Sequence, residues 1–368
     1  MKLLRFAIIL ILSSVAASGY AAEDSDSLEF SELPWFKQLA KNNFDVNAPG
    51  INYPRFARFC LKVYNWGDKT FNTYDSTYVV GTGKNWKAML RSYNWNDGFA
   101  LYFNRKNYLY INSDIYSDLG AHLSFMAVSI GYTVDANAYF GGGSSGSRHN
   151  FNFNFVCALF SAGISSSKAT GGTTINHFGD YSPESGRLKY KFDDISQESL
   201  SGTIYYFFNH RKYSQGAAYN FSRYQLKSAG SWLSGFSFSN QRIKMDFSRL
   251  PDELTSHLPS LEKNYHFRYT DYDILGGYGY NWVLKPRKWL INGTIMPSVG
   301  YKHSYEGTTE GRRDMFSTNI RGNFSIVYNH RSLFAAMIGN YEGHFYFARG
   351  FTFYNSIASL SLVAGVRF

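Results

Sequence analysis

The sequence has little cysteine, and it has no long apolar run beyond its first residues. Cys60 and Cys157 are the two cysteines among 368 residues. Two cysteines cannot form a disulfide framework, and we expect these two to stay unbonded because they fall at different levels of the fold. Past residue 12 the most apolar stretch is 119–134. It contains several polar residues and is shorter than the roughly 20 residues that a membrane-spanning helix needs, so a bundle of such helices is excluded.

Motifs for catalysis or ligand binding are also scarce. The nine histidines include no pair at metal-binding spacing with a third ligand nearby. The segment 141–146 matches the dinucleotide pattern G-x-G-x-x-G, but a strand pattern follows it where a helix is required, so we interpret it as a flexible loop. Asp193-Asp194 and Asp271-x-Asp273 are carboxylate pairs that we place in exposed loops, with a calcium site as the alternative. We predict no cofactor and no metal.

The net charge is +10. A basic chain can bind nucleic acid, but no basic recognition motif is present, so we expect no nucleic-acid partner. An exported basic chain meets anionic lipid and polysaccharide first. We therefore expect outer-membrane lipid and lipopolysaccharide as partners, with a further surface or periplasmic partner left unnamed.

The first 21 residues have the pattern of a secretory signal peptide. Lys2 and Arg5 precede the apolar run 6–12, and the small residues Gly19 and Ala21 follow it. We expect cleavage near Ala21, which makes the protein an exported one.

Residues 22–74 differ from the rest of the chain, and we interpret them as a periplasmic segment. Apolar and basic residues over 53–65 are spaced as on a short amphipathic helix, with Pro54 in its first turn and Gly67 as its stop. A weaker helix is predicted around Leu39. Two interpretations of the basic helix stay open. In one it docks on the inner leaflet or closes a barrel from below, and in the other it packs against periplasmic turns.

Aromatic residues are abundant. They make up 19% of the chain, yet the mean hydropathy is only −0.30. A soluble core with so many rings would usually carry more aliphatic residues as well. Outer-membrane barrels place rings in girdles at both membrane interfaces, which fits a polar average with many aromatics.

Several stretches alternate between apolar and polar residues with a period of two. In residues 358–368 the even positions are apolar and most odd positions are small or polar, and 289–303, 315–328 and 149–157 repeat the pattern. Successive strand side chains point to opposite faces, so each stretch has one face for lipid and one for a lumen. The lumen-facing candidates are Asn292, Thr294, Lys302, Asn319, Arg321 and Asn323.

These strands predict an all-β fold, an antiparallel transmembrane β-barrel over residues 75–368 with about 12 strands, in a range of roughly 10 to 14. The alternative is a soluble periplasmic β-sandwich, which also alternates. The predicted strands are 75–82, 84–95, 98–113, 118–136, 149–163, 198–210, 221–240, 269–283, 289–303, 315–328, 333–347 and 351–368.

If the C-terminus lies in the periplasm, successive connections alternate between the periplasmic and the outer side of the membrane. This counting puts the long segments 164–197, 241–268 and 304–314 outside. One connection, 137–150, is then a long periplasmic turn, which such barrels avoid. A miscounted strand before it is the simplest explanation.

The last residues have the form of an insertion signal. Phe368 is a terminal aromatic residue, and Val366 continues the apolar row before it. Outer-membrane barrels present such a strand to their insertion machinery, which we therefore expect as a partner.

The C-terminal half resembles a known family. The motifs that carry the resemblance are structural glycine and aromatic patterns: Ser228-Ala229-Gly230-Ser231, Gly276-Gly277-Tyr278-Gly279-Tyr280-Asn281-Trp282-Val283, Trp289-Leu290-Ile291-Asn292 and Pro297-Ser298-Val299-Gly300-Tyr301. Together they resemble a Bacteroides-type outer-membrane barrel family known as a domain of unknown function, over most of the chain after about residue 70. The resemblance implies a fold and a location, and it brings no catalytic residues.

One pair of residues keeps an enzyme hypothesis open. His122 and Ser124 share a strand face, and a histidine beside a serine can activate the hydroxyl for lipid hydrolysis if an acid orients the ring. No such acid is identified, and polar residues inside a barrel are the simpler explanation. We therefore favour a narrow channel or a surface scaffold, with a lipid-modifying hydrolase as the alternative.

Overall fold

The computed structural model describes residues 30–42, 45–46, 48–71, 73–84, 86–125, 128–137, 146–183, 188–305 and 313–368. The predicted signal peptide and most of the glycine-rich segment 141–146 lie outside these residues. The chain divides into two compact units, Met1–Tyr64 and Asn65–Phe368, and each is described by itself.

The first unit is helical where it is described. It contains the short 3-10 helix η1 (Phe30–Glu32), α2 (Trp35–Lys41) and the start of α3 (Arg55–Phe71). Gln38 is fully buried and ties these pieces together, because its amide donates to Leu33 O at 2.7 Å and accepts from Asn52 N at 2.7 Å. No helix among the described residues is both long and apolar enough to cross a membrane.

The prediction that the basic helix stops at Gly67 is wrong. Helix α3 continues to Phe71. A glycine inside a helix costs about 1 kcal/mol relative to alanine. The last turn makes contacts that offset this cost: Phe71 O accepts a hydrogen bond from Ala158 N at 3.1 Å, and the Phe71 ring packs against Phe160.

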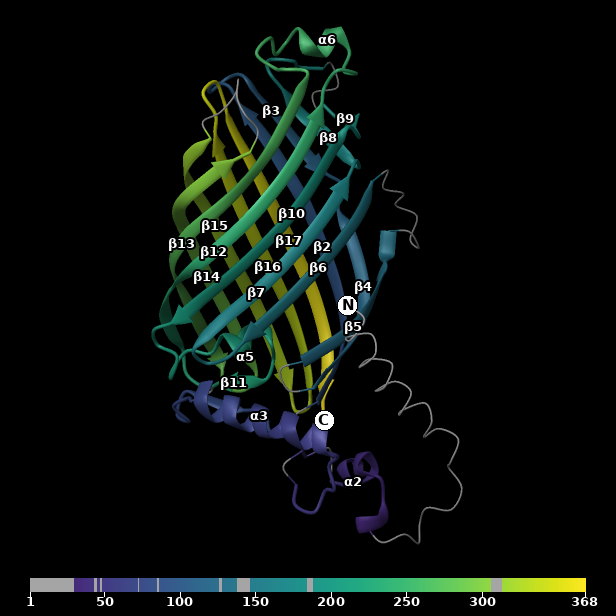
Figure 1. Ribbon diagram of the computed structural model, residues 1–368, viewed down its shortest axis with the longest axis vertical. Coiled ribbons are helices and arrows are strands. Elements are labelled where there is room, and N and C mark those ends of the chain that lie inside the picture. The colour runs from purple at the N-terminus through teal and green to yellow at the C-terminus, as the bar shows by residue number, and fades with distance from the viewer. Residues whose placement is uncertain are drawn as a thin grey trace. The chain divides into compact units, whose positions relative to one another are not determined.

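The second unit is one large antiparallel sheet that curls into a barrel, with a small two-stranded sheet of β1 (Val79–Gly81) and β11 (Arg223–Gln225) beside it (Figure 1). The strands of the large sheet are β2 (Trp86–Tyr102), β3 (Tyr108–Ser113), β4 (Tyr116–Phe125), β5 (Val128–Asp135), β6 (Ser147–Val156), β7 (Phe160–Thr170), β8 (Thr173–Phe178), β9 (Tyr190–Phe192), β10 (Ile195–Phe207), β12 (Ala229–Asp246), β13 (Asn264–Lys285), β14 (Trp289–Ser304), β15 (Asp314–His330), β16 (Leu333–Phe347) and β17 (Thr352–Arg367).

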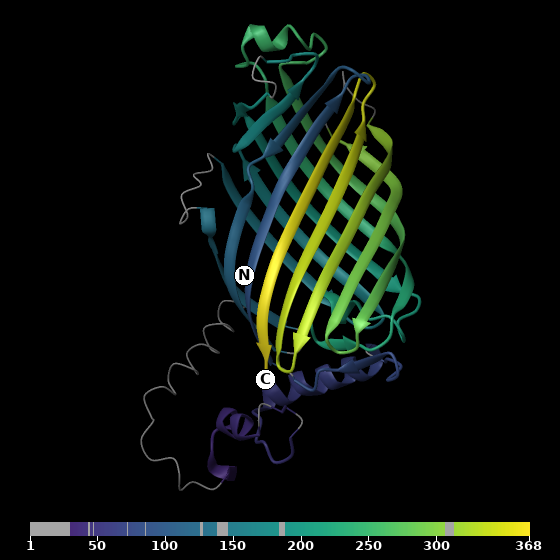
Figure 2. The same cartoon turned by 180° about the vertical axis from the view of Figure 1, so that it is seen from behind.

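The last long strand closes against the first. Strand β17 pairs with β2 over sixteen residue pairs, from Thr352↔Tyr102 to Arg367↔Lys87, and Figure 2 shows them side by side. Counting each bent strand once, the barrel has β2, β3/β4, β5, β6, β7/β8, β9/β10 and β12 to β17. The prediction of an antiparallel barrel with about 12 strands is thereby confirmed. The sheet is continuous, so the two packed sheets of a sandwich are not its architecture.

We call the end of the barrel that holds Phe368 the C-terminal end, and the other, which carries α6 (Asp252–Thr255), the far end. Near the far end the ring is complete, because β3 pairs with β8 and β8 pairs with β9. In the other half, β5 pairs with β4 and β6 pairs with β7. Within the described residues no ladder joins β5 to β6, so a seam runs between these two strands.

Several predicted strand boundaries in the first half of the barrel are wrong. In the described residues 75–84, β1 is the only strand. The predicted break near Asp97-Gly98 is also absent, because Gly98 packs inside β2, where a Cβ would lie 2.7 Å from Ser356 Oγ. The chain turns instead at Asn104, whose side chain accepts hydrogen bonds from the N–H groups of Lys106 and Asn107.

Two predicted single strands are in fact hairpins. Residues 118–136 form β4 and β5, and 149–163 contain β6 and the start of β7. Neither reversal carries a glycine, proline or asparagine in the sequence, so the usual turn signals are missing. Counted back from the C-terminus, the added strand of the second hairpin reverses the chain direction before it, so β5 runs toward the far end and β6 runs away from it. The anomalous long periplasmic turn is thereby removed.

The two faces of the wall differ in chemistry. Outward side chains are large, apolar and exposed: Phe236 is 65% exposed, Ile274 59%, Ile295 56% and Leu362 52%. Inward side chains are mostly buried and form three layers along the axis. An aromatic and aliphatic cluster fills the far end, polar and charged residues fill the middle, and two smaller apolar clusters fill the C-terminal end.

Candidate functional site

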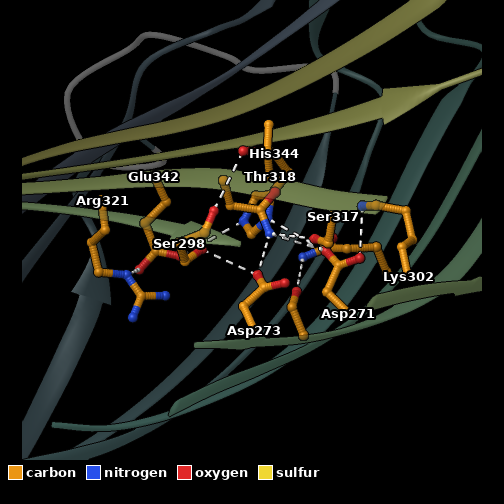
Figure 3. A network of polar contacts seen from close by, with 12 residues as sticks. Asp271, Asp273, Ser298, Lys302, Ser317, Thr318, Arg321, Glu342 and His344 are labelled. Atoms are coloured by element: carbon orange, nitrogen blue, oxygen red, sulfur yellow. Dashed lines mark hydrogen bonds and ion pairs between the residues drawn. The ribbon is translucent and has the colours of Figure 1, made fainter. Parts of the chain in front are cut away.

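The middle layer brings charged side chains from four neighbouring strands together. They alternate with outward residues along β13, β14, β15 and β16, so the period of two points all of them inward. Figure 3 shows their arrangement. We call this set the buried polar network, and its members are Asp271, Asp273, Ser298, Lys302, Ser317, Asn319, Arg321, Glu342 and His344.

Two ion pairs anchor the network. Lys302 Nζ lies 2.7 Å from Asp271 Oδ1, and the two side chains are 0% and 1% exposed. Strand register places them directly opposite each other. The Lys302 ammonium also lies 3.9 Å from the centre of the Tyr269 ring, which closes that side. The second pair joins Arg321 Nε to Glu342 Oε1 at 3.1 Å, again between directly opposed residues.

Neutral side chains connect Asp271 to the neighbouring carboxylate Asp273. Asn319 donates to Asp273 Oδ2 at 2.6 Å and to Asp271 Oδ2 at 3.4 Å, and Ser298 Oγ donates to Asp273 Oδ2 at 3.2 Å. Paired charges with additional hydrogen bonds are the form in which ions are tolerated in a protein interior. The network therefore links four strands through side chains as well as through their backbone ladders.

His344 lies between two carboxylates. Its Nδ1 is 3.9 Å from Asp271 Oδ2, and its Nε2 is 3.9 Å from Glu342 Oε2, both beyond hydrogen-bonding distance. A cavity of about 20 Å³ adjoins the imidazole and is lined by Asp273, Ser298 and Arg321 among others. Its volume fits one water molecule. Among the described residues, no group of three or more metal-binding side chains is placed to hold a metal ion.

The network is covered on its far-end side by stacked rings. Phe267 and Phe353 lie 4.1 Å apart with almost parallel planes, and Tyr265 and Tyr346 pack around them. The side chains of Phe267 and Phe353 are 2% and 0% exposed. This cluster separates the charged layer from solvent at the far end.

The C-terminal end is filled by the connection between β10 and β12, residues 208–228, which we call the plug. It contains α5 (Gln215–Tyr219), whose alanines pack with inward residues such as Val327 and Phe334. Arg367 Nε donates to Phe221 O at 2.8 Å, and Lys87 Nζ donates to Asn220 O at 2.6 Å. These contacts tie the plug to both strands of the closure.

The plug also binds polar residues of the wall. Tyr219 OH donates to Asn292 Oδ1 at 2.7 Å, and Asn292 Nδ2 donates to Tyr213 OH at 3.0 Å. Burial raises the pKa of the Tyr213 phenol, which keeps it protonated. Thr294 Oγ1 donates to the same Asn292 oxygen at 3.1 Å.

The structure places all six lumen-facing candidates on the inner face. Lys302, Asn319 and Arg321 belong to the buried polar network, Asn292 and Thr294 belong to the plug contacts, and Asn323 lies between these two groups. Whether any of them acts on a transported molecule stays a prediction.

The expected loop position of Asp271-x-Asp273 is wrong. Both side chains are buried inside the barrel, 1% and 4% exposed, because they lie within β13 at positions that face inward. The predicted strand 269–283 already contained both residues, so its inward parity was the signal for their burial. Glu342 and His344 were missed by the sequence analysis. Their signal was present, since both are charged or titratable residues at the inward parity of a correctly predicted strand.

His122 and Ser124 both lie on the inner face of β4, opposite Met89 and Lys87 of β2. His122 Nε2 is buried without a hydrogen-bond partner among the described residues. Phe368 stacks on Trp86, and the two residues exchange backbone hydrogen bonds of 3.1 Å, while Val366 lies opposite Leu333 and Ala88. Cys157 is a free, buried thiol.

Comparison with known proteins adds the family. Residues 73–368 match a family described as a domain of unknown function (DUF4421). The chain belongs to this family. A search of curated proteins finds no match for the DUF4421 chain.

Solved structures similar to the DUF4421 chain include a protease, a channel and a transporter. The outer membrane protease OmpT from Escherichia coli is 9% identical, with a TM-score of 0.33, and the alignment covers 77% of this chain and 97% of OmpT. The CymD monoaromatic hydrocarbon channel is 10% identical (TM-score 0.25, coverage 77% and 89%). The toluene transporter TodX from P. putida is 6% identical (TM-score 0.23, coverage 77% and 90%).

Proposed function

We propose that this DUF4421 protein is an outer-membrane barrel with a blocked lumen, which acts as a scaffold for its far-end segments and does not form an open channel. The observation that carries the proposal is the filling of the lumen at three successive levels by the aromatic cluster, the buried polar network and the plug. The core residues of the two apolar levels and the Lys302–Asp271 pair of the network each have less than about a tenth of their surface exposed, while Arg321 and Glu342 are 15% and 28% exposed. An ion entering from either end meets packed protein.

The location rests on the outer wall. Rows of exposed aromatic and aliphatic residues cover it, including Phe236, Ile274 and Leu362. A soluble protein rarely exposes so large an apolar area, whereas a bilayer requires it. Export by a cleaved signal peptide over 1–21 and a Bacteroides-type origin of the envelope belong to the same proposal, as does a role for Phe368 and Val366 with the insertion machinery.

Conductance of the purified protein in planar bilayers tests the blocked lumen. We expect no steady open level from the wild-type chain. Replacing 213–222 of the plug by a short Gly-Ser linker should also leave the lumen closed, because the aromatic cluster and the buried polar network still fill the other two levels. A matched control replaces the exposed turn 286–288 by Gly-Ser-Gly and should stay closed as well. A steady conductance of the wild type, or of the plug variant while the control stays closed, would contradict the filling of the lumen at three levels.

The hydrolase alternative stays a separate prediction. If His122 and Ser124 form a base and nucleophile, purified protein will turn over phospholipid or lipid A, and His122→Ala and Ser124→Ala will each abolish that turnover. We expect neither His122→Ala nor Ser124→Ala to cause such a loss.

A further inference from the structure

Four cations lie on the outer face of the barrel near the far end, Lys168 on β7, Arg242 and Lys244 on β12, and Arg268 on β13. The imidazole of His266 on β13 completes the group, opposite Lys244. All five residues are exposed. We call this group the cationic strip. It was not singled out by the sequence analysis, because its members come from three separate strands.

Strand register puts two arginines directly opposite each other. Arg242 pairs with Arg268, and Lys244 pairs with His266. Directly opposed side chains on one face have Cβ atoms about 4.5 to 5.5 Å apart, and like charges at such a position destabilise the sheet. The pairing is therefore unfavourable in the protein alone.

A single carboxylate partly compensates one side of the strip. Glu198 lies opposite both Lys168 and Arg242, at 2.7 Å and 3.4 Å from their charged atoms. Arg268 instead lies over the Tyr305 ring, 5.1 Å from its centre. Within the described residues, no ion pair joins Arg268 or Lys244 to a carboxylate. The strip keeps an excess of positive charge on its β12 and β13 side.

The strip borders the apolar part of the wall. Leu200 follows Glu198 by two positions on the outer face, and Tyr272 follows Arg268 by four, and they are 44% and 54% exposed. A strand rises about 3.3 Å per residue, so the charges lie within about 13 Å of these side chains along the strand. This is the depth at which lipid phosphates meet a protein whose apolar rows contact acyl chains.

We propose that the cationic strip binds the phosphate groups of lipopolysaccharide, with the acyl chains lying along the apolar rows next to it. The inference rests on the proposed outer-membrane location. Arginine suits this ligand because its planar fork donates two parallel hydrogen bonds to a phosphate. A bound phosphate between Arg242 and Arg268 also replaces their repulsion by two attractive contacts.

The test uses the full chain in non-ionic detergent and measures binding of diphosphoryl lipid A by native mass spectrometry. The variant is Arg242→Gln/Arg268→Gln. The control is Lys285→Gln/Lys288→Gln, which removes two exposed charges at the opposite end. We expect Kd for diphosphoryl lipid A to rise about tenfold or more in the variant, as loss of charge-assisted hydrogen bonds implies, and to change less than about twofold in the control.

Several outcomes would overturn the proposal. They are equal weakening in variant and control, undiminished binding of fully dephosphorylated lipid A by the wild type, or displacement of lipid A by inorganic phosphate at equal concentration, which would assign the strip to free phosphate. A lipid-free measurement separates binding from folding: the thermal midpoint of Arg268→Gln should equal or exceed that of the wild type, because a repulsion is removed. A lower thermal midpoint would mean that Arg268 stabilises the folded protein, which would contradict the repulsion on which the proposal rests. Fractionation of the wild type away from the outer membrane would instead refute the proposed location, independently of lipid A binding.

Discussion

The two halves of the barrel are built differently. Strands β12 to β17 are 15 to 22 residues long, and their ladders keep one register except for a shift between Val283 and Lys285. The half formed by β3 to β10 has short strands, bends and the seam between β5 and β6. The half formed by β12 to β17, which we call the regular half, has the same strand neighbours along its whole length. In the half formed by β3 to β10, which we call the adaptable half, the strands change neighbours along the barrel axis.

The bend between β7 and β8 shows how the adaptable half changes partners. Gly171 and Gly172 have φ of +64° and +63°, a left-handed conformation that glycine adopts at little cost. The bend carries the chain from its ladder with β10 to a ladder with β3. Local backbone conformation thus decides where the ring closes.

The buried ion pairs differ in the same way. Lys302–Asp271 joins directly opposed residues of paired strands. Arg148–Asp97, at 2.7 Å and with side chains 4% and 7% exposed, joins β6 to β2, which share no ladder among the described residues. In the regular half an ion pair reinforces a ladder, and in the adaptable half it spans strands where a ladder is missing.

The largest expected effect comes from breaking the pair in the regular half. Lys302→Met should lower the free energy of unfolding by about 3 to 5 kcal/mol, because it leaves Asp271 buried without its cation. Lys302→Met combined with Asp271→Leu should recover most of the loss. Denaturant titration of bilayer-folded protein measures both. If the double variant is as unstable as the single one, the pair is not the cause.

A charge introduced on the outer wall should lower the free energy of unfolding by a smaller amount. The same charge on the inner face should cost less still, so the comparison distinguishes the two faces of the wall. Phe324 is outward and 43% exposed, while Asn323 is inward. We expect Phe324→Lys to lower folding into bilayers by about 2 to 4 kcal/mol if the site is near the midplane, and Asn323→Lys to cost much less. Equal losses in a membrane-folding titration would show that the outer wall does not face lipid.

Deleting Phe368 should change the stability of inserted molecules by less than these substitutions. Its ring contributes roughly 1.5 to 3 kcal/mol of burial, which is too little to unfold a large barrel. The defect should appear during assembly, as periplasmic accumulation and proteolysis. Outer-membrane fractionation and heat-modifiable gel migration compare the wild type with a chain that ends at Arg367. Unchanged outer-membrane yield would argue against a terminal insertion signal.

The mildest perturbation, hydrogen exchange of the unmodified protein, should show the contrast between the halves directly. Amides on the unpaired edges of β5 and β6 should exchange at least about tenfold faster than those of β14 and β15, because opening them breaks fewer hydrogen bonds. Mass spectrometry of peptides covering 128–135, 147–156 and 289–304 gives the comparison. Equal protection of these peptides would mean that β5 and β6 pair in the membrane.

Much of the regular half was determined by the sequence alone. The predicted strand 333–347 matches β16, 289–303 ends one residue before β14 does, and 315–328 begins one residue after β15 does and ends two residues before it does. A period of two is a local property, because neighbouring side chains of a strand must point to opposite faces wherever the strand lies.

The tertiary structure alone decided the rest. The hairpins at 118–136 and 149–163 and the plug over 208–228 have no local pattern that predicts them. The same holds for the cluster of Asp271, Arg321 and His344, which are inward residues of three different strands. Alternation shows on which face of its strand a side chain lies. The neighbours of that side chain depend on strand register and on what fills the lumen, and contacts between residues far apart in the chain set both.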